Sequence, residues 1–245
     1  MTIKIGLLLD NTYTSKYVYN IIKWADERND IDVSHFIIHK TSNTDISFLS
    51  KIIKHIIHKG IIEIPKLICW RILIKLESIL LKKSYFFDHL KIFDLSYLNK
   101  QIVYIYPEKI KKDNVLRFEK NEINKIKSLN LELLIRCGSG ILRGEVLKIN
   151  KFGILSFHHG DNRKYRGGPA GFWEVYNHEK STGFIIQQLT NELDAGKIIY
   201  RGNFITKKHY LLNQAHLYTK SNYYMKLVLL DLAKNNKLTE FKNES

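Results

Sequence analysis

The sequence predicts an α/β fold with a mostly parallel sheet and helices on both faces. Short apolar runs that end in polar or glycine-containing turns recur along the chain, and stretches with helical periodicity separate them. Strands that alternate with helices are typical of a parallel sheet covered on both sides, because parallel strands need long crossover connections. With 44% hydrophobic residues in 245, the chain can bury a full core in one main domain.

The expected elements follow in chain order. The first apolar run ends at Asp10, and Thr12 or Thr14 is expected to cap the helix that follows, which runs to about Arg28. A short helix is expected over residues 141–149. The apolar runs expected as strands span residues 3–9, 33–38, 102–106, 131–136, 153–157 and 184–189, with a last strand near Phe204.

A helical insertion interrupts this alternation over residues 47–90. Its pattern indicates two or three basic amphipathic helices, broken near Gly60 and Pro65. Residues 51–90 hold eight Lys or Arg against three Asp or Glu, so attachment to an anionic membrane surface is one interpretation. The favoured interpretation is packing on the domain or on a second subunit, with solvated lysines. It predicts a buried apolar face that includes Ile56, Ile57, Ile72, Leu76 and Leu80.

Charge and cysteine content limit the classes of partner and compartment. A formal charge of +15 favours anionic partners, although a lysine-rich genome composition explains the same number. Cys69 and Cys137 are too few for a disulfide framework, so the cytoplasm is expected. The N-terminal run is too short for a signal peptide, and no apolar stretch reaches the about 18 residues that a spanning helix needs.

Residues with catalytic character gather between positions 131 and 200. The stretch contains, in this order, the turn 138–142, a strand ending in His158, the segments Tyr165-Arg166-Gly167, Pro169 and Trp173, Thr182-Gly183, and Leu193-Asp194-Ala195-Gly196. In order and spacing, it resembles the formyltetrahydrofolate-dependent formyltransferases, a family that includes methionyl-tRNA, glycinamide ribonucleotide and nucleotide-sugar enzymes. The resemblance implies a Rossmann-like formyltransferase domain over residues 1–205, with the insertion at about 47–90, and a short helical extension over 206–245.

The chemistry of formyl transfer favours the same residues. The reaction needs a neutral amine, stabilisation of a tetrahedral oxyanion, and proton transfer from the attacking nitrogen to the leaving one. A histidine just beyond a buried strand can move protons near neutral pH, and a nearby acid can orient it or raise its basicity. His158 and Asp194 are therefore the expected catalytic pair.

Ser156 marks a departure from the family pattern. The family usually has Asn-x-His, whose asparagine amide donates to the oxyanion, whereas this chain has Ser156 two residues before His158. Either Ser156 shares that role with His158, His159 or Asn162, or the chain has lost formyl transfer. Catalysis is expected, with Ser156 as the third catalytic residue, because loss of one oxyanion donor costs roughly a hundred- to a thousandfold and leaves activity.

The resemblance also implies binding residues. The pterin of N10-formyltetrahydrofolate, the expected co-substrate, is implied to lie against Gly140, Ile141 and Leu142 and against Thr190, Asn191, Glu192 and Leu193. The substrate-binding residues expected in the loop after His158 are His159, Asn162, Arg163 and Arg166, since a guanidinium group suits a diphosphate. No metal is expected, because the adjacent residues His158 and His159 point apart and cannot share an ion with Asp161.

The acceptor is expected to be an amino sugar linked to a nucleotide. Methionyl-tRNA enzymes carry a second domain, whereas about forty residues follow the last strand here; glycinamide ribonucleotide enzymes have a Gly-Ser-rich phosphate loop where this chain has residues 10–14. This expectation implies a role in lipopolysaccharide O-antigen biosynthesis, no nucleic-acid partner and no stable membrane insertion, with a homodimer left open. The alternatives are a non-catalytic or altered-activity protein on the same scaffold that binds nucleic acid or a membrane surface, and an enzyme that formylates another amine such as methionyl-tRNA.

Overall fold

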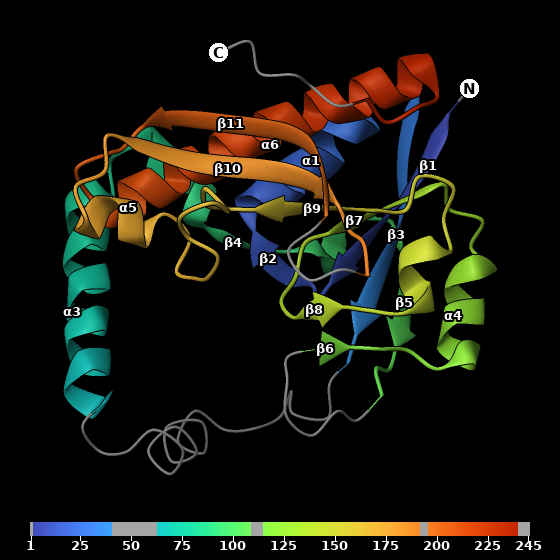
Figure 1. Ribbon diagram of the computed structural model, residues 1–245, viewed down its shortest axis with the longest axis horizontal. Coiled ribbons are helices and arrows are strands. Elements are labelled where there is room, and N and C mark those ends of the chain that lie inside the picture. The colour runs from blue at the N-terminus through green and yellow to red at the C-terminus, as the bar shows by residue number, and fades with distance from the viewer. Residues whose placement is uncertain (1, 41–62, 109–114, 192–195, 240–245) are drawn as a thin grey trace.

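A seven-stranded sheet forms the centre of the molecule (Figure 1). The computed structural model describes residues 2–40, 63–108, 115–191 and 196–239. The strands lie in the order β11-β10-β9-β7-β1-β3-β5. Their bounds are β1 (Ile3–Leu9), β3 (Ile31–His39), β5 (Gln101–Ile105), β7 (Leu133–Arg136), β9 (Ile154–His158), β10 (Ser181–Gln188) and β11 (Lys197–Ile205), which agree with the expected strands to within a few residues.

The sheet is mostly parallel, as predicted. β1 pairs in parallel with β3 and β7, and β3–β5 and β7–β9 are also parallel pairs. β10 and β11 extend the sheet as antiparallel strands beyond β9. The chain passes from β1 outward to β3 and β5 and then returns to β7, so the strand order reverses between β1 and β7. In open α/β sheets, ligands bind beyond the carboxyl ends of the strands at such a reversal.

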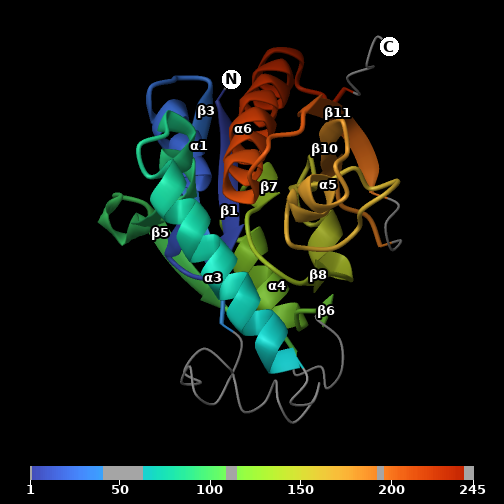
Figure 2. The ribbon, with the colours of Figure 1, turned by 90° about the vertical axis from the view of Figure 1, so that its left-hand side faces the viewer.

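Helices cover both faces of the sheet, which confirms the predicted fold class. Alternate residues of β1 enter two separate apolar clusters: Leu7 and Leu9 pack with residues of α1 (Lys16–Asp26) and α6 (Tyr210–Asn235), and Leu8 packs with residues of α4 (Lys120–Lys127). Burial on both faces explains why β1 is a continuous apolar run rather than an alternating one. Figures 1 and 2 show α1 and α6 together on one side of the sheet.

Two local predictions are wrong. Residues 141–149 do not form a helix: β8 (Ile141–Leu142) pairs with β6 (Val115–Leu116), and only η3 (Glu145–Lys148) is a 3-10 helix. Between them Gly144 has a φ of 90°, a conformation that favours glycine and ends the strand. Neither Thr12 nor Thr14 caps α1, because β2 (Tyr13–Ser15) pairs with β4 (Ile92–Asp94) and the helix begins after Ser15.

The described part of the helical insertion is one long helix and a short 3-10 helix. These are α3 (Glu63–Leu81) and η1 (Tyr85–Leu90); residues 47–62, with Gly60, Ile56 and Ile57, lie outside the described residues. Pro65 does not break a helix but lies in the first turn of α3, where its missing N–H costs no hydrogen bond. α3 stands at the edge of the molecule beside the start of α6 (Figures 1 and 2).

α3 packs through a different face from the one predicted. The Trp70 ring lies 5.2 Å from the Tyr210 ring, and the Glu77 carboxylate, on a residue only 8% exposed, accepts hydrogen bonds at the start of α6. Ile72, Leu76 and Leu80 are 52%, 56% and 71% exposed, so their predicted burial against the sheet is wrong. Both faces of α3 are apolar, and periodicity could not select between them; the second-subunit interpretation stays a prediction. Within the described residues, no helix is both long and apolar enough to cross a membrane.

Candidate active site at the carboxyl edge of the sheet

His158 and Ser156 lie together on one face of β9. Phe157, between them, packs toward the core on the side of α1 and α6, and residues two apart in a strand share a face, so His158 and Ser156 point to the other side. Nε2 of His158 lies 3.1 Å from the carbonyl oxygen of Tyr165. Because a carbonyl can only accept, Nε2 carries the proton, and in the neutral imidazole Nδ1 is the basic nitrogen.

Asp194, the other half of the expected catalytic pair, lies outside the described residues, as do Glu192 and Leu193. Their roles stay predictions. The chain enters that segment at Asn191 and leaves it at Gly196. A Cβ on Gly196 would lie 3.0 Å from Oε1 of Gln187, and Gln187 is the direct neighbour of Ser156 in the sheet. The described chain therefore resumes at Gly196 beside β10, the strand that pairs with β9.

A polar network that the sequence analysis did not identify lies at the same edge. Oδ1 of Asp10, just beyond β1, is 2.7 Å from Nε2 of His39 at the end of β3, and both Asp10 carboxylate oxygens accept from the N–H of Ser139 at 2.9 Å. Burial alone would raise the pKa of Asp10, but these hydrogen bonds and the charge of Arg136 bring it below its ordinary value. A Cβ on Gly138 would collide with Oδ1 of Asp10, so the turn requires glycine here.

A cavity of about 220 Å³ opens where the strand order reverses. It lies at the ends of β1 and β7, one strand away from β9. Its walls offer a carboxylate, an amide, several hydroxyl groups and tyrosine rings, a combination suited to a polar ring-shaped ligand. The lining residues are Asp10, Asn11, Tyr13, Thr14, Ser15, Tyr17, Ile92, Cys137 and Tyr218. We call this cavity the switch-point pocket.

The two segments expected to hold the pterin are joined in the structure. The N–H of Gly144, just after β8, donates to Oδ1 of Asn191 at 3.0 Å. Within β8 the Leu142 side chain is buried, whereas Ile141 is 45% exposed and offers an apolar surface beside the φ of 84° at Gly140. Exposed apolar area next to accessible backbone suits a flat heteroaromatic ring. These residues therefore fit the co-substrate that the resemblance implies.

The expected substrate-binding residues do not form one group. The ring of His159 stacks on Phe157 and contacts Tyr17 and Tyr218, and its Nε2 lies 3.1 Å from Oγ of Ser221. Desolvation lowers the pKa of His159 to about 3, so the ring is neutral at physiological pH. His159 thus packs on the α1 and α6 side, away from His158, and this position favours a packing role.

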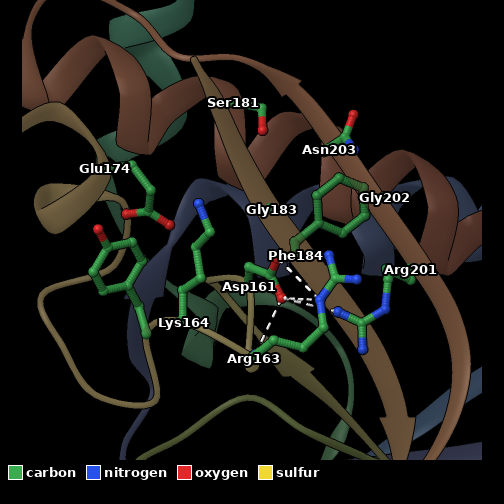
Figure 3. A pocket seen from close by; sticks show the side chains of 11 residues that line it. Asp161, Arg163, Lys164, Glu174, Ser181, Gly183, Phe184, Arg201, Gly202 and Asn203 are labelled. Carbon is green, nitrogen blue, oxygen red and sulfur yellow. Dashed lines mark hydrogen bonds and ion pairs between the residues drawn. The ribbon is translucent and has the colours of Figure 1, made fainter. Parts of the chain in front are cut away.

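Arg163 lines a second cavity, of about 240 Å³, shown in Figure 3, whereas Asn162 is not among its lining residues. Arg163 donates to both carboxylate oxygens of Asp161, and Arg201 donates to Asp161 and to Oδ1 of Asn162. The hydrogen bonds from Arg163 lower the pKa of Asp161 to about 2 despite partial burial. The guanidinium of Arg163 is thus engaged by a carboxylate, while Nε of Arg166 donates to the carbonyl of Asn162 at 3.1 Å. Across the described ranges, no cluster of three or more His, Cys, Asp and Glu could hold a metal ion.

Comparison with known proteins relates part of the chain to one group of enzymes. No protein-family model matches the chain. The methionyl-tRNA formyltransferase of Malacoplasma penetrans is 31% identical over 105 residues, which cover 40% of this chain and 33% of the relative. That of Thermodesulfovibrio yellowstonii is 38% identical over 94 residues, which cover 38% of this chain and 28% of the relative. The similarity thus spans about a third of the length of these curated relatives.

Solved structures resemble the whole fold. Glycinamide ribonucleotide transformylase 1 from Symbiobacterium toebii has a TM-score of 0.59 and 12% identity, covering 96% of this chain and 89% of that one. A formyltetrahydrofolate deformylase from Pseudomonas syringae pv. tomato has a TM-score of 0.56 and 11% identity, covering 96% of this chain and 62% of that one. The chain is therefore similar to the formyltransferases. Its Rossmann-like fold resembles theirs over nearly its whole length, and its sequence is similar to that of methionyl-tRNA formyltransferases over about two-fifths of its length.

Proposed function

We propose that this chain is an enzyme that transfers a formyl group from N10-formyltetrahydrofolate to an amine, with His158, Asp194 and Ser156 as catalytic residues. The observation that carries the proposal is the position of His158. It ends β9 with its Nε2 bonded to a carbonyl and its Nδ1 basic, at the edge where the switch-point pocket and the segment 140–144 also lie. The catalytic domain comprises residues 1–205, and the extension 206–245 contributes α6, which packs on the sheet.

The reaction requires two bond changes and one proton transfer. The acceptor nitrogen bonds to the formyl carbon, and the carbonyl π electrons move to the oxygen. When the pair returns, the bond from carbon to N10 breaks, and N10 leaves with its electron pair. A proton must pass from the attacking nitrogen to N10, and Nδ1 of His158 is a suitable relay near neutral pH, with Asp194 orienting the ring.

The co-substrate is proposed to lie against Gly140, Ile141, Leu142, Thr190 and Asn191, together with Glu192 and Leu193. The hydrogen bond from Gly144 to Asn191 supports this assignment, because it holds the two segments at a fixed separation. The exposed Ile141 side chain gives this surface an apolar part, which favours a flat ring. No metal ion is part of the proposal.

The acceptor is proposed to be an amino sugar linked to a nucleotide, as in the synthesis of lipopolysaccharide O-antigen. Support comes from the switch-point pocket at the same carboxyl edge, whose hydroxyl, amide and carboxylate groups can bind sugar hydroxyls. Arg166 at the edge of the neighbouring loop can approach the diphosphate. Formylation of methionyl-tRNA is the second candidate, favoured by the names of the sequence relatives. Cys69 and Cys137 are both free, which supports a cytoplasmic location.

The test is formyl transfer to a panel of nucleotide-linked amino sugars and to methionyl-tRNA, with N10-formyltetrahydrofolate as donor and mass spectrometry as readout. We expect formylation of at least one amino sugar and none of the tRNA. His158→Gln should abolish transfer, whereas the matched control His35→Gln, on β3 and with its Nδ1 2.8 Å from Oγ of Ser34, should retain it. Equal transfer by wild type and His158→Gln would remove His158 from the mechanism.

A further inference from the structure

Arg136 is a buried cation with unused hydrogen-bond donors. It ends β7, and the residue is only 4% exposed. The nearest carboxylate oxygen, Oδ1 of Asp10, lies 3.6 Å from Nη2, which is too far for a good hydrogen bond. Within the described part of the chain, none of its Nε, Nη1 and Nη2 atoms has a hydrogen-bond partner. Guanidinium stays protonated in proteins, and buried groups of this kind are normally satisfied, so this exception requires a cause.

The sheet register puts Arg136 beside the candidate catalytic residues. Arg136 is the direct partner of Ser156 in the parallel pair β7–β9. Ile135, the residue before it, packs in the core on the side of α1 and α6, so Arg136 points to the opposite face, which is also the face of Ser156 and His158. A Cβ on Gly138 would lie 2.9 Å from Nη1, so the guanidinium extends along the strand toward the carboxyl edge.

Asp10 does not neutralise this charge fully. Its carboxylate is engaged by His39 and by the N–H of Ser139, and these closer contacts use both oxygens. Arg136 is thus held by an ion pair at long distance, and its buried nitrogens have no hydrogen-bond partner among the described residues. A fixed positive charge in a poorly solvated site is the arrangement that stabilises a developing negative charge most strongly.

We propose that Arg136 is a further catalytic residue, whose guanidinium stabilises the negative charge on the formyl oxygen in the role that an asparagine amide has in related sequences. This inference rests on the proposed formyl transfer. The guanidinium donates hydrogen bonds to the formyl oxygen while the carbonyl π electrons are on that oxygen, and it neither gains nor loses a proton. Ser156, with one short hydroxyl already donated to the carbonyl of Phe157 at 3.2 Å, then makes only part of the interaction.

The same cation could instead bind an anionic group of the acceptor, and kinetics separate the two roles. An interaction made only in the transition state changes kcat and leaves KM and ground-state binding almost unchanged. An interaction with a phosphate or carboxylate of the substrate raises the KM of the acceptor. We expect the first result, a lower kcat with KM almost unchanged.

The experiment compares Arg136→Met with wild type and with Arg28→Met, which removes a surface arginine paired with Asp30. Consumption of N10-formyltetrahydrofolate is followed with the nucleotide-sugar panel and with water alone as acceptor, and binding of 5-formyltetrahydrofolate, an unreactive donor analogue, is measured by calorimetry. We expect Arg136→Met to lower kcat by roughly a hundred- to a thousandfold, with analogue affinity within about twofold and Arg28→Met unchanged. Ser156→Asn in the Arg136→Met background should recover part of kcat, because it supplies an amide donor.

Three further variants guard against a merely structural effect. If Arg136→Met does not fold, Arg136→Lys and Arg136→Gln give the same comparison, and guanidinium chloride at about millimolar concentration should partly rescue Arg136→Ala, measured against sodium chloride at equal ionic strength. A kcat for Arg136→Met within about threefold of wild type, or a loss confined to the acceptor KM, overturns the role of Arg136 while formyl transfer stands. If the wild type neither consumes the donor nor binds its analogue, the proposed function fails, and this inference fails with it.

Discussion

Glu77 of α3 should stabilise the start of α6 more than any surface residue of the insertion does. Its Oε1 accepts from the N–H of Tyr210 at 3.0 Å, and its Oε2 accepts from the N–H of Leu211 at 2.7 Å. His209, the residue that precedes α6, makes no side-chain cap, so Glu77 supplies the cap from a distant segment. Tyr210 and Leu211 are only 4% and 6% exposed, and water cannot readily replace the carboxylate.

The expected loss follows from these contacts. Hydrogen bonds to a charged group contribute about 1.5–3 kcal/mol each, and a negative charge at a helix N-terminus adds about 0.3–1 kcal/mol. Allowing for partial relaxation, we expect Glu77→Ala to lower the free energy of unfolding by about 3–5 kcal/mol and Glu77→Gln by roughly 2 kcal/mol, since an amide keeps one acceptor. Lys75→Ala, an exposed change on the same helix, should stay within about 0.5 kcal/mol of wild type.

Urea unfolding followed by circular dichroism measures these differences, and hydrogen exchange of the amides of residues 210–213 reports the first turn of α6 directly. We expect faster exchange there in Glu77→Ala and no change in Lys75→Ala. If Glu77→Ala unfolds within about 1 kcal/mol of wild type and exchange at residues 210–213 is unaltered, the capping argument is incorrect.

Three other outcomes are expected. Ser156→Ala should lower kcat by roughly ten- to a thousandfold with little change in donor affinity, measured in steady-state assays; equal rates would mean that Ser156 is no donor. The stability that Asp161 adds relative to Asp161→Asn should be fully present above about pH 4 and lost as the pH falls toward its folded-state pKa of about 2, in urea titrations at several pH values; a difference independent of pH would contradict the ion pair with Arg163. Leu80→Glu should change the stability of the dilute monomer by less than about 0.5 kcal/mol, because Leu80 is 71% exposed; a large loss would mean that its face is covered.

The strands could be predicted because both faces of the sheet are buried. Continuous apolar runs such as residues 3–9 have few alternatives in a chain with polar turns, and their ends agree with β1 and its neighbours. β8 could not be predicted, because two residues acquire strand structure only by pairing with Val115 and Leu116, about 25 positions away. The outward face of α3 was missed for a related reason: both of its faces are apolar, and tertiary contacts with Tyr210 decide which one is buried.

The candidate site could be predicted only where one segment carries it. Ser156 and His158 share a strand, so their spacing alone puts them on one face. Asp10, His39 and Arg136 come from three strands, and each one alone resembles an ordinary polar residue at a strand end. The sequence feature that these three residues share is their position, directly after or at the end of an apolar run. A rule that examines every such residue in a parallel sheet would have found all three.

The row of residues along the carboxyl edge also ties activity to the order in which the chain folds. His39, Arg136 and Ser156 lie on three strands and Asp10 directly follows a fourth, all adjacent in the sheet, although they are spread over nearly 150 positions of the sequence. Contacts between such distant positions form slowly, because a long loop must lose chain entropy on closing before the contact stabilises the structure. A refolding chain can have native helices and a compact core while β9 is still undocked, and in that state it has no partial site. Catalytic competence should therefore return with the pairing of β7 and β9, later than the recovery of helical structure.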